Sequence, residues 1–308
     1  MNRRELTRLL GTGLLASAMT PRIGFAAEPP QVAITMDDFN LFGADEPTAE
    51  KRNQAILSAL RAHSVKAAIF VCGTCIDSAP GKRLLKQWDD AGHIIANHTY
   101  SHPNYAHTDF RRYSADILRC EAIIKGYPQF RRFFRFPYLK EGNTAEQRDR
   151  MRSFLADHGY KNGAVTIDAS DWYIDDRLRK RLSTDSKANT TGYRDYYLQH
   201  IADRSRYYND LSGRVLGRSV RHTLLVHHNV LNELYLGDVL EQYKRQGWKL
   251  IDAERAYADP IFNEEPDVLP AGNSLVLALA LQSGKTKLPR DPPEDGEYEA
   301  PNMDRLGL

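Results

Sequence analysis

Ile34-Thr35-Met36-Asp37-Asp38-Phe39 is the stretch around which the rest of the chain is organised. Two adjacent carboxylates follow an apolar run, Val32-Ala33-Ile34, that is typical of a buried strand. Because aspartate is depleted from strand interiors, the pattern predicts a strand that ends at the two carboxylates. At such a strand end, one carboxylate can bind a metal ion while its neighbour acts as a base.

The 308-residue chain is 42% hydrophobic and 27% charged, which is ordinary for a soluble globular protein. Its N-terminus differs, because the twin arginine Arg3-Arg4 precedes a short apolar run at 9–19 and a small-residue site near Ala26. These features predict an export signal of the twin-arginine type over residues 1–26, and therefore a periplasmic or secreted protein. A membrane anchor would need a longer apolar span.

Removal of that segment changes the net charge. The whole chain carries +2 at pH 7, and residues 1–26 hold four arginines and one glutamate, so the remaining chain carries −1. This balance gives no indication of nucleic acid or an anionic membrane surface as a partner. No membrane span is expected after signal removal.

The three cysteines are Cys72, Cys75 and Cys120. Cys72 and Cys75 have CxxC spacing, but the chain has no second CxxC and no nearby histidine that would complete a structural zinc site. In an exported protein a disulfide is the expected use, and the sequence leaves the pairing open. Cys120 lies on the apolar stripe of an expected helix, so we expect it to be buried.

Apolar strands alternate with amphipathic helices along most of the chain. Strands are expected at 32–38, 67–71, 94–96, 133–136, 163–167, 223–226 and 248–251. Helices are expected at 48–62, 81–91, 109–124 after a Thr108 cap, 144–158 after a Thr144 cap, and 234–246. This alternation favours a parallel α/β sheet or barrel.

Two regions depart from this alternation. Residues 173–221 are polar, charged and rich in tyrosine, with helical fragments, and we interpret them as an insertion. Residues 259–308 form a Pro-rich acidic C-terminal tail with one apolar run at 275–281. We expect this tail to lie along the domain, where its apolar run could add one strand, and to end in a disordered segment.

Polar motifs stand at the C-terminal ends of five expected strands. They are Asp37 and Asp38, His98 and His102, Arg135, Asp168 and Asp171, and His227. The carboxyl ends of parallel strands meet at the edge where α/β proteins build their sites, so we expect these side chains to converge.

His98 and His102 are spaced so that both can lie on one face of a helical turn and share one ion. With one aspartate they would make a catalytic metal centre that leaves positions open for water and substrate. The plainer alternative is a pair of loop histidines bonded to backbone. Successive strand residues point to opposite faces, so only one of His227 and His228 should face the site, and alternation does not say which.

Five motifs, in order, resemble those of the polysaccharide deacetylases, carbohydrate esterase family 4 with its NodB-homology domain. They are Thr35-Met36-Asp37-Asp38, His98-Thr99-Tyr100-Ser101-His102, Arg135-Phe136-Pro137-Tyr138, Asp168-Ala169-Ser170-Asp171-Trp172 and Leu225-Val226-His227. The resemblance covers residues 31–256 and implies a distorted, incomplete (β/α) barrel of about seven parallel strands. It also implies metal-dependent removal of acetyl groups from an N- or O-acetylated polysaccharide or oligosaccharide.

The resemblance assigns the metal and the base. Asp38, His98 and His102 would hold a divalent ion, which is usually zinc in the family. Asp37 would be the general base that takes a proton from the attacking water. Arg135 would pair with Asp37 and keep it ionised; the plainer alternative for Arg135 is an ordinary strand-end salt bridge.

The resemblance also assigns the groups around the leaving atom. The backbone N–H of Tyr138 would stabilise the oxyanion of the tetrahedral intermediate. His227 would be the general acid, with Asp171 orienting its imidazole. Trp172 and Leu225 would line the pocket for the acetyl methyl, although a tryptophan is more often a core residue.

The chain departs from the family pattern at Met36 in place of phenylalanine, at His228 in place of aspartate, and in the run Leu139-Lys140-Glu141 after Tyr138. Together with the long segment 173–221, these departures motivate an alternative, a catalytically silent glycan-binding protein on the same scaffold. A phosphoesterase is a third hypothesis. It is less favoured because that chemistry tends to use two metals, whereas one complete ligand set is visible.

Overall fold

The computed structural model describes residues 28–39, 46–284 and 296–308, so the expected export signal lies outside the described residues. Seven strands form one parallel sheet with the order β5-β4-β3-β2-β1-β6, and β7 also pairs with β1. Their bounds are β1 Gln31–Asp38, β2 Ala68–Val71, β3 Ile94–Asn97, β4 Phe130–Phe134, β5 Lys161–Asn162, β6 Arg221–His227 and β7 Lys249–Leu250.

β1 is the central strand of this sheet. It pairs with β2 over residues 35–38 and with β6 over residues 31–37. β7 pairs with residues 31 and 32 of β1, which β2 does not reach. Residues 32–37 of β1 are all buried, as expected for a parallel strand that is covered on both faces.

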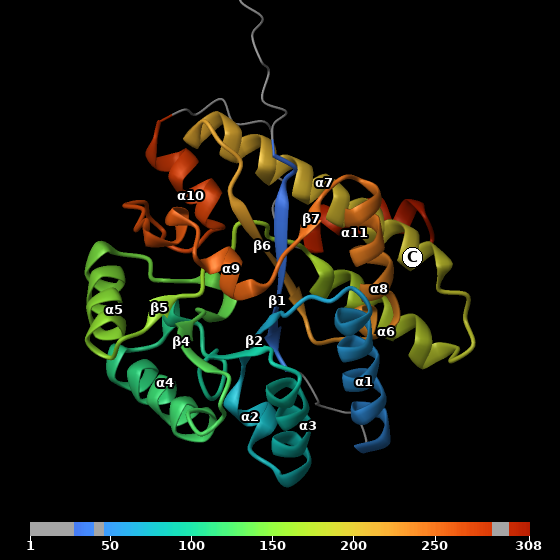
Figure 1. Ribbon diagram of the computed structural model, residues 1–308, viewed down its shortest axis with the longest axis horizontal. Coiled ribbons are helices and arrows are strands. Elements are labelled where there is room, and N and C mark those ends of the chain that lie inside the picture. Colours follow the sequence, from blue (N-terminus) through green and yellow to red (C-terminus); the bar gives the residue numbers. More distant parts are fainter. Residues whose placement is uncertain (1–27, 40–45, 285–295) are drawn as a thin grey trace, which may run out of the picture.

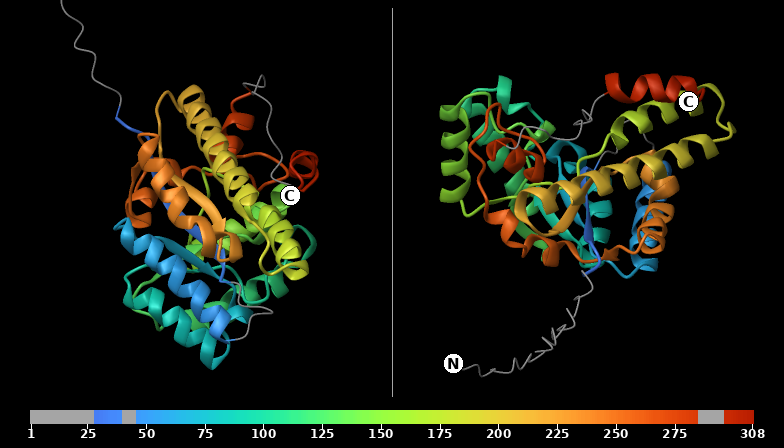
Figure 2. Two further views of the ribbon diagram at one scale, coloured as in Figure 1. Left: turned by 90° about the vertical axis from the view of Figure 1, so that its right-hand side faces the viewer. Right: turned by 90° about the horizontal axis from the view of Figure 1, so that it is seen from above.

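Helices surround the curled sheet (Figures 1 and 2). They are α1 Glu46–Ala62, α2 Gly73–Ile76, α3 Ala79–Asp90, α4 Phe110–Ile124, α5 Ala145–Asp157, α6 Asp171–Thr184, α7 Thr191–Leu216, α8 Val230–Arg245, α9 Ala253–Tyr257, α10 Leu275–Gln282 and α11 Gly296–Arg305. Short 3-10 helices lie at Tyr105–His107, Pro137–Leu139 and Pro260–Asn263. The predicted α/β fold, an incomplete barrel of parallel strands, is confirmed.

The expected strand at 163–167 is wrong. The strand next to β4 is the two-residue β5, and Gly163 still donates its N–H to the Phe134 carbonyl at 2.7 Å. Beyond it the chain leaves β4, and Ile167 forms an isolated bridge with Leu224 of β6. Residues 163–167 therefore cross between the two sides of the curled sheet, which is why they cannot pair along one neighbour.

Other boundaries shift as well, and α8 begins at Val230 instead of residue 234. β4 ends at Phe134 instead of Phe136, because the chain turns into the 3-10 helix that begins at Pro137. The cap of α4 is Asp109, whose side chain accepts the Arg112 N–H at 3.0 Å. Thr108 instead donates its hydroxyl to the Asn104 carbonyl.

The segment 173–221 forms most of α6 and all of α7, and Tyr197 and Tyr208 of α7 are completely buried. In the tail, the run from Leu275 is the buried helix α10 instead of a strand, because Ser274 caps it and α7 covers it. α11 packs beside α6 (Figure 2). Both regions are therefore packed onto the barrel by buried side chains.

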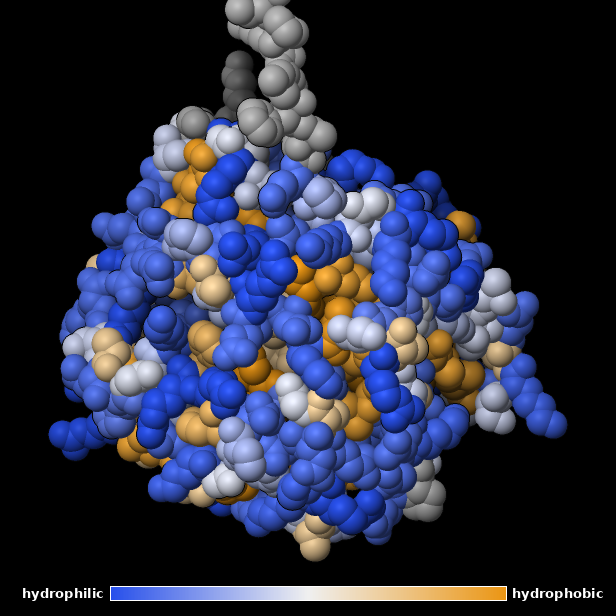
Figure 3. All heavy atoms as spheres, in the orientation of Figure 1, coloured by the Kyte–Doolittle hydropathy of each residue, from blue (hydrophilic) through white to orange (hydrophobic). Residues whose placement is uncertain are grey.

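The surface face in Figure 3 is mainly hydrophilic, with apolar residues showing between polar ones near its centre. Among the described residues, no helix combines the length and the apolar character needed to cross a bilayer.

All three cysteines lie within the described residues as buried free thiols, so the expectation of a disulfide is wrong. The Cys72 thiol donates to the Tyr100 carbonyl at 3.2 Å, and the Cys120 thiol donates to the Val71 carbonyl at 3.4 Å. The thiols of Cys72 and Cys120 are thus directed at carbonyl oxygens. The predicted burial of Cys120 is confirmed.

Candidate active site

The carboxyl ends of β1, β3 and β4 bring several strained backbone positions to one edge of the sheet. Asp38 has φ 75°, Thr99 67°, His102 57° and Tyr138 57°, and all four lie in the left-handed region. For a residue with a side chain this conformation costs roughly 1–2 kcal/mol. Such strain persists where surrounding structure imposes it, and its clustering is typical of a functional site.

Asp38, His98 and His102 offer three ligand atoms that lie within 4.8 Å of one another. Asp38 Oδ1 is 3.5 Å from His98 Nε2 and 3.3 Å from His102 Nε2. The two imidazole rings are 5.0 Å apart between centroids. The structure thus brings together the three residues that the sequence predicts as metal ligands.

The segment from His98 to His102 is a loop and not the helical turn that the spacing suggested. The Asn97 side chain accepts the Thr99 N–H at 2.8 Å, and the Thr99 hydroxyl accepts the His102 N–H at 3.1 Å. Asp116 of α4 accepts the N–H groups of the two intervening residues. Side-chain bonds to backbone, together with two left-handed residues, turn both imidazoles toward Asp38.

These three residues fit a divalent ion. His98 Nδ1 lies 2.8 Å from the Arg135 carbonyl, which can only accept, so Nδ1 carries the proton and Nε2 keeps its lone pair. Burial and the neighbouring His102 lower the pKa of His98 to about 3, so the ring is neutral. Asp38 Oδ1 is buried and accepts no hydrogen bond from the described residues. Two imidazoles and a carboxylate suit zinc.

Asp37 lies beside this ligand set and is paired with Arg135. The guanidinium Nη1 donates to Asp37 Oδ1 at 2.6 Å, while Asp37 Oδ2 lies 3.7 Å from His98 Nε2. Burial raises the pKa of Asp37, and Arg135 opposes that rise. Arg135 is itself fixed by bonds from Nε to the Gly163 carbonyl at 2.8 Å and from Nη2 to the Tyr257 hydroxyl at 2.9 Å.

On another side of the site, Asp171 holds His227 through two bonds. Asp171 Oδ1 accepts from His227 Nδ1 at 2.7 Å, and Oδ2 accepts the His227 backbone N–H at 2.8 Å. Burial lowers the pKa of His227, but Asp171, Asp38 and Asp37 outweigh it and raise the pKa to about 10. The ring is therefore protonated at neutral pH, with Nε2–H left to donate.

A cavity of about 690 Å³ joins these groups. Its lining includes all the predicted metal ligands together with Asp37, Tyr138, Trp172, Leu225 and His227. Trp172 is 44% exposed and Leu225 is buried. Asp168 also lines the cavity, and burial raises its pKa to about 6.

His228 stands next to His227 but is completely buried. Its Nε2 is 3.3 Å from Asn53 Oδ1, and its ring lies 4.7 Å from the Phe39 ring. Both histidines contribute to the lining of the cavity, so the expectation that only one would face the site is wrong. Asp171 holds His227, a choice that strand alternation left open.

Sequence reasoning missed several supporting residues. Asn229 and Asn232 each donate to Asp171 Oδ2 at 3.0 Å, and the Tyr197 hydroxyl donates to Asn232 Oδ1. Tyr257, whose hydroxyl accepts a hydrogen bond from Arg135, is the last residue of α9 and is distant from Arg135 in the sequence. Only Asn229 carried a sequence signal, as a helix cap just after the strand end at His227.

The family model described as polysaccharide deacetylase matches residues 26–163. The resemblance to the polysaccharide deacetylase family is therefore confirmed. The match contains Asp37, Asp38, His98, His102 and Arg135, whereas Asp171 and His227 lie beyond it.

Two curated deacetylases match part of the chain. A peptidoglycan-N-acetylglucosamine deacetylase of Bacillus cereus is 31% identical over 145 residues, 46% of this chain and 46% of that protein. A chitooligosaccharide deacetylase of Rhizobium leguminosarum bv. trifolii is 32% identical over 111 residues, 35% of this chain and 50% of that protein. The chain thus spans about half the length of these relatives.

A solved structure of a carbohydrate esterase family 4 pseudoenzyme from Bacillus anthracis has the same fold. The TM-score is 0.53 at 19% identity, covering 74% of this chain and 65% of that one. At this identity the likeness concerns the fold alone.

Proposed function

We propose that this chain is an exported, metal-dependent hydrolase that removes acetyl groups from an N- or O-acetylated glycan. The observation that carries the proposal is that a two-histidine, one-aspartate set lines one cavity together with Asp37 and His227, where Arg135 pairs with Asp37 and Asp171 with His227. The names of the two curated relatives point to glycans that contain N-acetylglucosamine.

Asp38, His98 and His102 would hold the ion. When bound, a divalent ion supplies Lewis-acid chemistry, because it polarises an acyl carbonyl and lowers the pKa of water. Asp37 takes the proton of the attacking water through Oδ2, since Oδ1 accepts the hydrogen bond of Arg135. Arg135 opposes the rise in the Asp37 pKa that burial causes, and so favours the ionised carboxylate.

The remaining groups act on the acyl oxygen and the leaving atom. The Tyr138 N–H takes no part in the backbone bonds of its turn, where Leu139 and Lys140 donate to Phe136 and Pro137. It is therefore available to the developing oxyanion. His227 Nε2–H gives its proton to the leaving nitrogen or oxygen, which completes the hydrolysis.

Acetate release tests this proposal. Mature protein would be assayed with chitin, peptidoglycan, xylan and poly-N-acetylglucosamine fragments, before and after treatment with a chelator and re-addition of Zn²⁺. We expect release from at least one glycan, loss with the chelator, recovery with the ion, and no release by Asp38→Ala. Full activity in Asp38→Ala, or a protein that binds no metal, would contradict the proposal.

The same assay separates the alternative of a catalytically silent glycan-binding protein. That alternative predicts sugar binding without acetate release from any of the four substrates, and unchanged binding in Asp37→Asn. The complete set of paired acid and base residues around the metal ligands favours the enzyme.

A further inference from the structure

The C-terminal tail reaches the active site at Gly272. Gly272 and Asn273 line the large cavity that contains the metal ligands, and they also line a second cavity of about 250 Å³. These two residues therefore form a wall between the cavities. The family model ends at residue 163, so this wall comes from outside the matched region.

Gly272 packs directly against the turn that carries Tyr138. Its φ is +119°, and a Cβ there would lie 2.0 Å from the Leu139 carbonyl oxygen and 2.8 Å from the Lys140 Cα. No side chain fits at such distances from backbone atoms. Only glycine allows the tail to approach the turn this closely.

Hydrogen bonds join the same two segments. The Glu141 N–H donates to the Ala271 carbonyl at 3.0 Å, and the Ala271 N–H donates to the Gly142 carbonyl at 2.9 Å. These bonds make an antiparallel bridge between residues 142 and 271. The tail therefore fixes the chain directly after Tyr138 and Leu139, both of which are left-handed.

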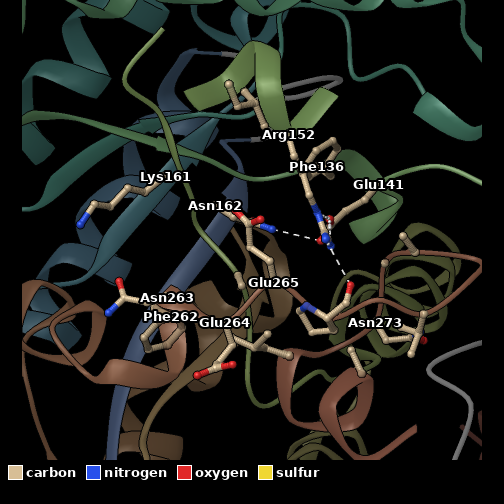
Figure 4. Close-up of a pocket in the computed structure, with 18 of the residues that line it drawn as sticks. Phe136, Glu141, Arg152, Lys161, Asn162, Phe262, Asn263, Glu264, Glu265 and Asn273 are labelled. Atoms are coloured by element: carbon tan, nitrogen blue, oxygen red, sulfur yellow. Dashed lines mark hydrogen bonds and ion pairs between the residues drawn. The ribbon is translucent and has the colours of Figure 1, made fainter. Parts of the chain in front are cut away.

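An ion pair between Arg152 and Glu141 lies in the lining of the second cavity, next to this bridge (Figure 4). Arg152 of α5 donates twice to Glu141 Oε2, at 3.1 and 2.9 Å, and Asn162 donates to Oε1 at 3.0 Å. Arg152 Nη1 also donates to the Pro266 carbonyl of the tail at 3.2 Å. Arg152 thus ties the tail and the turn to the same helix.

We propose that these contacts form a tail clamp, defined as Pro266, Ala271 and Gly272 with Arg152, that positions the Tyr138 N–H for oxyanion stabilisation. The clamp rests on the proposed function for its catalytic consequence. Gly272 and Arg152 are positioning residues, because they act through the turn and do not touch the reacting atoms. Misplacement of an oxyanion donor lowers kcat with little effect on substrate binding.

The test compares zinc-loaded full-length variants on tri-N-acetylchitotriose. Gly272→Ala should lower kcat at least tenfold, and Arg152→Gln about threefold to tenfold, with KM and zinc content within twofold of the wild type. Amide hydrogen exchange over residues 137–142 should become faster in both. Gly217→Ala is the control for strain alone, since Gly217 has φ +71° and no atom within 4 Å of its Cβ position. Arg150→Gln, on the same helix as Arg152, is the control for charge.

Equal kcat in the clamp and control variants would overturn the inference, as would unchanged exchange over residues 137–142. Loss of zinc together with activity would also overturn it, because the clamp would then act on the metal site. If Gly272→Ala does not fold, the kcat and the amide hydrogen exchange of Arg152→Gln decide whether the inference holds. If the wild type releases no acetate from any glycan, the proposed function fails, and the exchange comparison alone decides whether the tail holds the turn.

Discussion

The Arg135 guanidinium and the Asp37 carboxylate form a buried ion pair, with Nη1 2.6 Å from Oδ1. The Arg135 guanidinium carbon also lies 3.9 Å from the centre of the Phe70 ring, so the cation is enclosed on several sides. An isolated charge in such a place would be costly, and each partner is tolerated there because of the other. This pair connects the stability of the barrel to the ionisation of the proposed base.

Replacing Arg135 should therefore change the pH dependence of activity. Arg135 opposes the rise in the Asp37 pKa that burial causes, so Arg135→Met should raise that pKa further. A base works only above its pKa, so the acid limb of the kcat/KM profile should move to higher pH. Arg135→Lys, which keeps the charge but not the three hydrogen bonds, should shift the limb less. An unmoved acid limb in Arg135→Met would exclude Asp37 as the base.

The alkaline limb of the pH profile of kcat should depend on Asp171. His227 must be protonated to act as an acid, and Asp171 is the largest influence that raises its pKa, against burial, to about 10. Asp171→Asn should lower this pKa and move the alkaline limb of kcat to lower pH. Asp176→Asn changes an exposed ion pair with Lys180 on the same helix and should leave the limb in place. Identical profiles for these two variants would rule out the orienting role of Asp171.

His227 should also make stability depend on pH in chelator-treated protein. Its folded pKa of about 10 lies above the ordinary value of 6.5, so the protonated ring contributes stability fully below pH 6.5. That contribution should be lost as pH rises from 6.5 to 10. Urea unfolding at several pH values should show this decline, and His227→Gln should reduce it. A decline of equal size in His227→Gln would mean that other groups cause it.

Two substitutions at Asp38 should separate strain from metal binding. Both Asp38→Ala and Asp38→Gly should abolish binding of Zn²⁺, because they remove the carboxylate ligand. Glycine relieves the left-handed φ of 75°, whereas alanine does not. The metal-free glycine variant should therefore be about 1 kcal/mol more stable than the alanine variant in urea unfolding. Equal stabilities would show that the backbone at Asp38 relaxes without cost.

Trp172 and Leu225 line the same cavity but should respond differently to truncation. Because Trp172 is 44% exposed, Trp172→Ala should change stability by no more than about 0.5 kcal/mol. It should raise KM roughly tenfold if the indole contacts substrate, a loss of about 1.4 kcal/mol. Leu225→Ala should instead destabilise the fold by about 2–5 kcal/mol. A large loss of stability in Trp172→Ala would assign the indole to the core.

The positions of the candidate catalytic and metal-binding residues can be predicted from the amino-acid sequence. Strands such as Gln31–Asp38 and Arg221–His227 can be recognised because a parallel strand that is buried on both faces carries a run of apolar residues, such as 32–34 and 224–226, before the sheet edge. Polar residues at the C-terminal ends of such parallel strands therefore lie at the same edge of the sheet. The prediction of a strand at 163–167 is wrong because an apolar run does not reveal whether a neighbouring strand pairs with it along its whole length.

The orientation of these side chains depends on tertiary contacts that the sequence does not reveal. The left-handed turns at Asp38 and Tyr138, the choice of His227 over His228, and the Asn232 bond to Asp171 all depend on contacts between distant parts of the chain. The polar, Pro-rich composition of the tail gives no indication that Gly272 lies against the Leu139 carbonyl. Local periodicity records which face of an element is buried, but it carries no information about which distant backbone will lie against it.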